Sequence, residues 1–155
     1  MPTLIDKLHR LGFEPEPQMQ KQQRKMVSVK EKGKKYTLDL IPPKECAGYQ
    51  VDGYIIKEGN KCDKLIVVDC VEHGWAEIFV ELKGKDINHA ILQLEETLKK
   101  ECFSHQTIKV KRARIVGQSI PRNTGNSVME RAKIRFIQKY KCDLRAFSSA
   151  PNESL

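Results

Sequence analysis

The sequence has no apolar run long enough to cross a lipid bilayer, which takes about 20 consecutive apolar residues. It begins with MPTLID, which lacks the basic stretch and long apolar segment that are typical of a secretory signal. The five cysteines are odd in number and show no disulfide-like spacing. Together these absences predict a cytoplasmic protein whose thiols stay free in a reducing compartment.

Motifs of several common enzyme classes are also missing. The 155 residues contain no phosphate-binding glycine loop, no Ser-His-Asp or Cys-His nucleophile arrangement and no internal repeat. The composition, 39% hydrophobic and 31% charged, is that of a globular protein, and the length suits one core. We predict a single domain over residues 1–155, with a partly mobile segment 1–25, a core 26–147 and a flexible tail 148–155.

Charge is unevenly distributed along the chain, which has a net charge of +8. Residues 1–37 carry a net +5, residues 38–98 a net −6 and residues 99–145 a net +10. An acidic centre suits a divalent cation, whereas basic flanks suit a polyanion. A merely solvated basic surface is the alternative, and the asymmetry favours nucleic acid as the partner.

The first part of the chain predicts a helix, a connector and a hairpin. Residues 3–12 place leucines on one side of a short helix that Gly12 stops. Residues 14–25 contain two prolines and four glutamines without apolar periodicity, so they read as a mobile connector. Residues 27–40 alternate around a Lys-Gly-Lys turn and predict a hairpin, which the following Pro-Pro pair ends.

The centre of the chain has three strand-like runs, at residues 49–57, 62–69 and 75–83. Turn signals separate them, EGN after the first run and EHG after the second. Because these connections are short, the three strands are expected to form an antiparallel meander.

The remainder of the chain alternates helices and strands. Helices are predicted over residues 86–101, with Asp86 as N-cap, and over the basic segment 128–140. Strands are predicted at 108–117 and 144–147, and a loop at 119–127. The strand–helix–strand unit should be a right-handed crossover between parallel strands. The predicted fold class is therefore α/β (α+β), a mixed central sheet with an antiparallel meander, a β-α-β crossover and flanking helices.

Two carboxylates and a lysine are expected to meet at one end of this sheet. Asp63 opens the second central strand, and Glu81 and Lys83 end the third, on one face, with Leu82 on the other. Antiparallel pairing brings Asp63 beside Glu81 and Lys83. Mg²⁺ binds oxygen ligands and needs only one or two protein carboxylates, while a lysine offers positive charge to attacking water and a developing phosphorane.

The segment CDKLIVVD…WAEIFVELKGKDINHAILQLEETL resembles the core of PD-(D/E)XK, or restriction-endonuclease-like, nucleases. The resemblance covers roughly residues 49–117 and departs from the pattern in one place, because a cysteine and not a proline precedes Asp63. It implies that Asp63, Glu81 and the Leu82 carbonyl bind Mg²⁺ or Mn²⁺, and that Lys83 positions or activates water.

The same resemblance implies two further groups near the metal. Some branches of the family use a glutamine in the following helix, and Gln93 stands at that place, with a solvated helix residue as the alternative. Many branches add an upstream acidic residue; Glu45 and Asp52 are the candidates for it here.

Basic residues of the second half predict contacts with phosphate. Lys109, Lys111, Arg112 and Arg114 line the strand next to the proposed site and are the main candidates. The basic helix is either a further contact or merely solvated; its cationic residues are Arg131, Lys133, Arg135, Lys139 and Lys141.

Two Cys-x-x-His pairs form a separate hypothesis. The pairs are Cys70 with His73 and Cys102 with His105. Both pairs are expected at the end of the sheet away from Glu81, so they could meet there and form a Cys₂His₂ zinc site, although of unusual spacing. Free thiols and surface histidines are the alternative.

The leading functional hypothesis is a Mg²⁺-dependent DNA endonuclease of the restriction, phage-defence or repair type. One site per chain predicts a homodimer if both strands of a duplex are cut. The alternative is a catalytically inactive module that binds nucleic acid or protein on a nuclease fold, and a third is a zinc-stapled interaction domain.

Overall fold

The computed structural model of the chain describes residues 2–84, 86–117 and 127–155. The elements occur in the order α1 (Leu4–Arg10), β1 (Gln22–Glu31), β2 (Lys34–Gln50), β3 (Lys64–Asp69), β4 (Trp75–Gly84), α2 (Ile87–Leu98), β5 (Ile108–Gly117), α3 (Ser127–Tyr140), β6 (Cys142–Phe147) and β7 (Asn152–Ser154), with 3-10 turns at Pro17–Met19, Val71–His73 and Glu101–Phe103. No helix within these residues is long and apolar enough to cross a membrane.

The strands form one mixed seven-stranded sheet in the order β1-β2-β3-β4-β5-β6, with β7 paired to β2. Strands β1 to β4 are antiparallel neighbours, as in the predicted meander, although its first strand is β2 and not residues 49–57. Strand β5 lies parallel to β4, and β6 lies parallel to β5, so the helices between them are crossover connections. The mixed α/β class is thereby confirmed.

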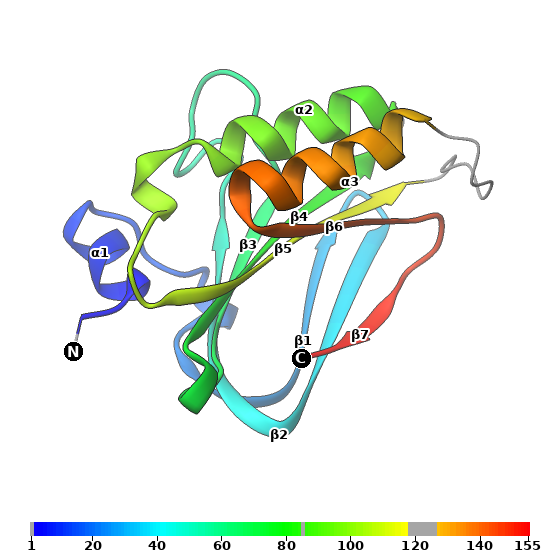
Figure 1. Cartoon of the computed structure of the whole chain (residues 1–155). Coiled ribbons are helices and arrows are strands. Elements are labelled where there is room, and N and C mark those ends of the chain that lie inside the picture. The colour runs from blue at the N-terminus through cyan, green and yellow to red at the C-terminus, as the bar shows by residue number, and fades with distance from the viewer. Residues whose placement is uncertain (1, 85, 118–126) are drawn as a thin grey trace.

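All three α-helices contribute to a core on one face of the sheet. Helices α2 and α3 lie side by side across the strands, and α1 lies beyond one end of them (Figure 1). This first core cluster combines Leu8 of α1, Leu94 of α2 and Phe136 of α3 with strand residues such as Phe79. Helix α2 forms as predicted, because the Asp86 side chain caps it by accepting a hydrogen bond from the Asn88 amide.

The sheet covers its own second face. Strand β2 bends strongly, so the hairpin of β1 and β2 turns back below the parallel strands (Figure 1). Its apolar residues, among them Val27, Tyr36 and Leu38, pack with Ile66 and Ile78 into a second core cluster. The central strands are therefore buried on both faces, which explains the nearly continuous apolar run of β3.

Two expected strand ends were wrong. The Pro42-Pro43 pair was predicted to end the hairpin, but β2 continues to Gln50. The β1–β2 register jumps from Met26↔Asp39 to Arg24↔Lys44, so the prolines fall where β2 needs no amide hydrogen to pair with β1. Residues 49–57 were predicted to be the first central strand, but β2 ends at Gln50. The chain turns after this residue because the Val51 carbonyl accepts hydrogen bonds from the amides of residues 54–56.

The two ends of the chain are more ordered than predicted. Within the connector 14–25, Gln22 already pairs with Cys46 as part of β1. The tail 148–155, predicted to be flexible, contains β7, which pairs with β2 through Leu38↔Glu153. Both segments are polar, so only tertiary partners explain their order. The predicted loop 119–127 lies largely outside the described residues.

Candidate functional site

Asp63 lies beside the stretch of β4 that carries Glu81. It comes directly before β3, and its amide donates to the Val80 carbonyl at 3.1 Å. Its carboxylate accepts from the Leu82 amide, so the contacts of Asp63 flank Glu81 on both sides. Glu81 itself lies two residues after Phe79 along β4, which places it toward the helix-covered core. That the two carboxylates act as one site stays a prediction.

Both carboxylates are buried. Asp63 is 3% exposed and Glu81 2% exposed. The Asp63 Oδ2 accepts a hydrogen bond from the Leu82 amide at 2.7 Å, which fixes the carboxylate against the end of β4. Burial, together with the negative charges of Glu81 and Asp63, raises the pKa of the Cys62 thiol. Both carboxylates therefore lie close enough to Cys62 to affect its pKa, which is consistent with their lying close to each other.

Helix α2 positions the segment that carries Asp63. The Gln93 side-chain amide donates to the Lys61 carbonyl at 3.1 Å, and the Thr97 hydroxyl accepts from the Cys62 amide at 2.9 Å. Gln93 therefore lies at the site, where its contact holds the backbone two residues before Asp63. The Thr97 contribution was not foreseen, since a threonine inside a helix carries no specific signal in the sequence.

The remaining residues predicted for this site have different outcomes. The Lys83 side chain lies outside the described residues, so its role stays a prediction. Asp52 lies at the same end of the sheet, one residue after Val51, whose amide donates to the Asp63 carbonyl. Glu45 was the wrong choice of upstream acid: it is next to Cys46, which pairs with Val68, so it lies at the other end of β3.

The four predicted phosphate contacts do not converge on the carboxylates. Lys111 pairs with Glu77, and Glu81 pairs with Ile115. At about 3.3 Å per residue, Lys111 is about 13 Å along β5 from the level of Glu81, and Lys109 is farther away. The strand that carries these lysines lies next to β4, as predicted, but parallel pairing sets the start of β5 beside the start of β4 and so away from Glu81. Their contact with phosphate stays a prediction.

Arg112 and Arg114 lie on the opposite face of the sheet. Arg114 is 1% exposed, and its guanidinium bonds Glu153 at 2.6 Å and Asp143 at 2.9 Å. Arg112 donates to the Ser154 carbonyl at 3.0 Å. Since strand residues alternate between faces, neither arginine reaches the side that holds Asp63. We do not retain Arg114 as a phosphate contact of the proposed site.

The predicted zinc site does not assemble. Cys70 packs in the second core cluster, whereas Cys102 packs against the first, on the other face of the sheet. His105 instead contacts the Thr107 hydroxyl at 2.8 Å. Throughout the described ranges, no three His, Cys, Asp or Glu side chains lie close enough to hold a metal ion together. The prediction considered only the end of the sheet at which each Cys-x-x-His pair lies, and not the face of the sheet on which it lies.

Glu77 is a buried acid that the sequence reading passed over. It is 1% exposed, and its Oε2 has no hydrogen-bond partner among the described residues. Burial raises the pKa of Glu77 to about 8, although the Lys111 and Lys7 ammonium groups lower it. The side chain is thus largely neutral at pH 7. Its place two residues before Phe79, on the buried face of β4, was the available signal.

A second ion-pair network joins the two crossover helices. Arg135 of α3 donates to both oxygens of Glu95 of α2, and the Tyr140 hydroxyl donates to the same carboxylate at 3.1 Å. Burial raises the pKa of Glu95, but these hydrogen bonds outweigh it and lower the value overall. Beside the network is a cavity of about 330 Å³ that Arg131, Leu92 and Val128 help to line.

The chain matches no protein-family model, no curated protein and no solved structure. The chemistry of the site therefore carries the functional inference. Two carboxylates side by side, one of them oriented by a backbone amide, form a hard oxygen donor set. Such a set fits Mg²⁺ or Mn²⁺, which bind one or two carboxylates and complete their shell with water and phosphate oxygens.

Proposed function

We propose that this protein is a Mg²⁺- or Mn²⁺-dependent nuclease that hydrolyses phosphodiester bonds, on a restriction-endonuclease-like fold. One observation carries the proposal: two buried carboxylates, Asp63 and Glu81, lie close together, since Asp63 contacts the residues on both sides of Glu81. Buried carboxylates at such a short separation offer the oxygen ligands that a divalent cation takes.

The order of elements around the pair supports the same proposal. The strand that carries Asp63 is followed by the strand that carries Glu81, then by α2 and by the parallel strand β5. This is the arrangement that the resemblance to PD-(D/E)XK nucleases implies. Gln93 of α2 also lies where that resemblance expects it, at the segment leading into Asp63.

In the proposed mechanism, Asp63 and Glu81 hold the divalent ion, and the Leu82 carbonyl adds a third oxygen. When bound, the ion supplies Lewis acidity toward the scissile phosphate and lowers the pKa of a bound water. The Leu82 amide keeps the Asp63 carboxylate oriented, and Gln93 keeps the preceding backbone in place. Lys83 offers positive charge to the attacking water and to the charge that develops on phosphate.

DNA is the proposed substrate, since the net charge of +8 favours a polyanion. With the strand lysines displaced from the site, helix α3 becomes the better source of phosphate contacts. Its Arg131 is exposed, and it follows β5, whose carboxyl end lies beside the end of β4. A homodimer, which light scattering on the DNA complex would detect, provides two sites for two strands. Restriction, phage defence and repair all suit such an enzyme.

Plasmid cleavage tests the proposal. The parent is expected to nick or linearise supercoiled DNA with Mg²⁺ or Mn²⁺ and to be inactive in a chelator, whereas Glu81→Gln stays inactive with metal. Glu96→Gln is the matched control, because Glu96 lies on α2 and forms an ion pair with Lys99 at its surface. Cleavage by Glu81→Gln at the parent rate would refute the metal site.

A binding module without catalysis is the second candidate. The observation in its favour is burial, because carboxylates that are 2–3% exposed offer little access to substrate in this conformation. A gel-shift assay that finds DNA binding equal in the parent and in Glu81→Gln, with no cleavage in any metal, would select this candidate over the enzyme.

A further inference from the structure

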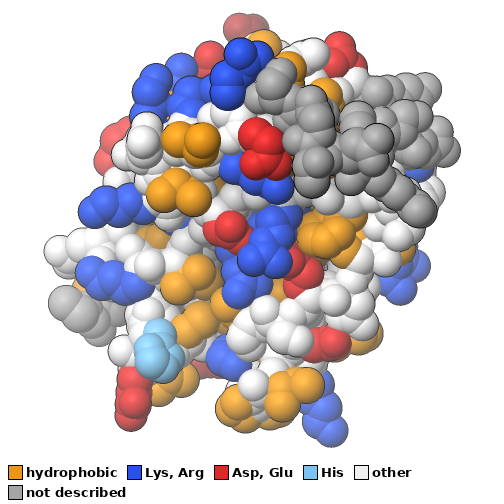
Figure 2. All heavy atoms as spheres, turned by 45° about the vertical axis from the view of Figure 1, so that its right-hand side comes forward, with side chains coloured by type: hydrophobic (Ala, Val, Ile, Leu, Met, Phe, Trp, Pro, Cys, Tyr) orange, Lys and Arg blue, Asp and Glu red, His pale blue; other side chains and the backbone are white. Residues whose placement is uncertain are grey.

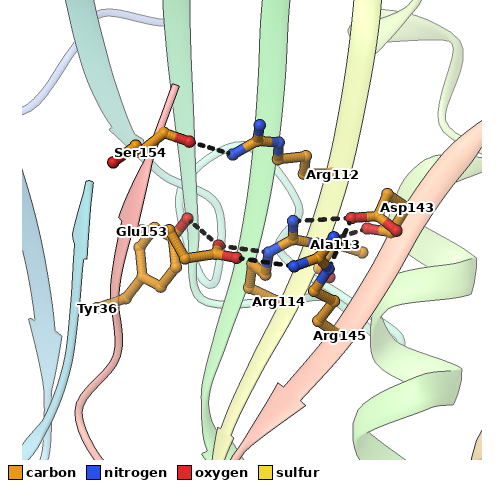
Figure 3. Close-up of polar contacts among 8 residues, drawn as sticks. All are labelled: Tyr36, Arg112, Ala113, Arg114, Asp143, Arg145, Glu153 and Ser154. Carbon is orange, nitrogen blue, oxygen red and sulfur yellow. Dashed lines mark hydrogen bonds and ion pairs between the residues drawn. The ribbon is translucent and has the colours of Figure 1, made fainter. Parts of the chain in front are cut away.

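The second face of the sheet carries a polar pocket that the proposed nuclease does not use. Its volume is about 270 Å³, and it is lined by Arg112, Arg114, Arg145, Glu153 and Ser154. Basic and acidic side chains gather in the middle of the face on which β6 and β7 lie (Figure 2). The three arginines come from β5 and β6, and their guanidinium groups extend toward β7 (Figure 3).

Arg114 forms the rigid floor of this pocket. Its guanidinium donates to Glu153 at 2.6 Å, to the Asp143 carboxylate at 2.9 Å and to the Asp143 carbonyl at 2.6 Å. Tyr36 adds a hydrogen bond to Glu153 at 2.7 Å (Figure 3). A guanidinium that is 1% exposed and held by this many acceptors has little freedom to move. The surrounding side chains are therefore preorganised.

Arg112 and Arg145 keep donors available at the rim. Among the described residues, Arg112 makes one hydrogen bond, to the Ser154 carbonyl at 3.0 Å, out of the five donors of a guanidinium. Arg145 uses its Nε for Asp143 at 3.1 Å, and its NH1 is 3.9 Å from Glu153. Three guanidinium groups face two carboxylates here, so the pocket keeps one positive charge.

We propose that this arginine pocket binds a terminal phosphate group, either inorganic phosphate or the monoester phosphate of a small molecule. Guanidinium groups bind phosphate through paired N–H donors, and the three guanidinium groups here outnumber the two carboxylates. Donors from both sides of the pocket contact several oxygens of one anion, and a monoester offers three free oxygens where a diester offers two. The volume is below the about 300 Å³ at which organic ligand sites begin, which suits a small anion.

The arginine pocket is separate from the carboxylate pair. Arg114 pairs with Val80, one residue from Glu81, but alternation places the two side chains on opposite faces of the sheet. Phosphate binding here requires no divalent metal and no intact nuclease site. The two proposals therefore succeed or fail independently.

Calorimetric titration at constant ionic strength tests the arginine pocket with three ligands: inorganic phosphate, a nucleoside 5′-monophosphate and dimethyl phosphate. The expected result is binding of the first two, and at least about tenfold weaker binding of the diester, because it lacks the third free oxygen. If only the nucleoside monophosphate binds well, the physiological ligand is a larger phosphate ester. If inorganic phosphate binds equally, the anion itself suffices.

The variants are Arg112→Gln and Arg145→Gln, tested singly so that the fold is kept, with Arg10→Gln on α1 as the control. Each pocket variant is expected to weaken phosphate binding about tenfold, and the control to leave it unchanged.

In the parent, phosphate should shift the NMR amide signals of Asp143, Arg145 and Ser154 but not those of Asn88 or Glu96. No binding at 10 mM, on the order of the weakest useful affinity, overturns the proposal. So does equal binding by dimethyl phosphate or by the pocket variants.

Discussion

The two faces of the sheet both bury charge, but they arrange it in opposite ways. Near the end of β4, two buried acids, Asp63 and Glu81, lie close together. On the second face, the Arg114 guanidinium is matched by Glu153 and Asp143. The second arrangement joins opposite charges and can be part of the fold, whereas the first offers the oxygen ligands that a divalent cation takes. The first face is therefore the candidate for catalysis, whereas the ion pairs on the second face hold the end of the chain, β7, against the sheet.

The largest expected effect concerns activity on the first face. If the proposed site is correct, Asp63→Asn is expected to lower metal-dependent cleavage by about two to three decades, because it removes one of the two charged ligands proposed for the metal. Its free energy of unfolding in urea should stay within about 1 kcal/mol of the parent, since the asparagine keeps an oxygen that can accept from the Leu82 amide. A variant that loses stability and activity together would show that the carboxylate pair is structural, which erases the contrast between the faces.

Lys83→Ala separates metal binding from turnover. Both carboxylates remain, so Mg²⁺ affinity measured by calorimetry should stay within about twofold of the parent, while the cleavage rate falls by about two decades. Lys99→Ala, an exposed lysine at the end of α2, serves as the control. If cleavage is unchanged in Lys83→Ala, this lysine has no part in the chemistry.

Stability is expected to respond most strongly on the second face. Arg114→Met leaves Glu153 and Asp143 without their buried guanidinium and should lower the free energy of unfolding by about 3–5 kcal/mol. Urea unfolding measures this loss, and exposed Arg10→Met is the control. If the free energy of unfolding falls by less than about 1 kcal/mol, as it does for a surface ion pair, the Arg114 network does not stabilise the position of β7.

Glu77 tests whether the helix-covered face tolerates another ionised acid. Its pKa is raised to about 8, so the folded protein keeps the proton that the unfolded chain releases near 4.5. The penalty is absent below pH 4.5 and grows as pH rises toward 8. Glu77→Gln should therefore be more stable than the parent by about 4 kcal/mol at pH 8 and equal to it at pH 4. Parallel stability curves for the two proteins from pH 4 to 8 would contradict this assignment.

The smallest effect is expected at Glu153, where the sign is reversed. Burial raises its pKa, but the Arg114 guanidinium and the Tyr36 hydroxyl outweigh that effect and lower the value below 4.5. This stabilisation is present above the unfolded pKa and is lost as pH falls through the folded one. Glu153→Gln should cost about 1–2 kcal/mol at pH 7 and less at pH 3. A cost that does not change between these pH values would exclude the ionised form as the source.

Much of the candidate site was predictable because it depends on local periodicity. Alternation along β4 and a short β3–β4 connection are sufficient to bring Asp63 beside Glu81, and helical spacing with an Asp86 cap is sufficient for α2. Gln93 was expected from the resemblance to PD-(D/E)XK nucleases and not from periodicity. The places of the four basic residues of β5 could not be predicted, because they depend on the register and face of that strand, which neighbouring strands determine.

The sequence by itself determined the mixed α/β class, the antiparallel pairing of β3 with β4 and the β-α-β unit, since each follows from periodicity and short connections. Only the tertiary structure decided that β2 bends, that the polar tail becomes β7 and that Arg114 is buried. Glu153 and Arg114 are 39 residues apart in the chain, and such a contact has no local signal. A polar segment is ordered when distant partners satisfy its charge and backbone, and those partners are known only once the chain has folded.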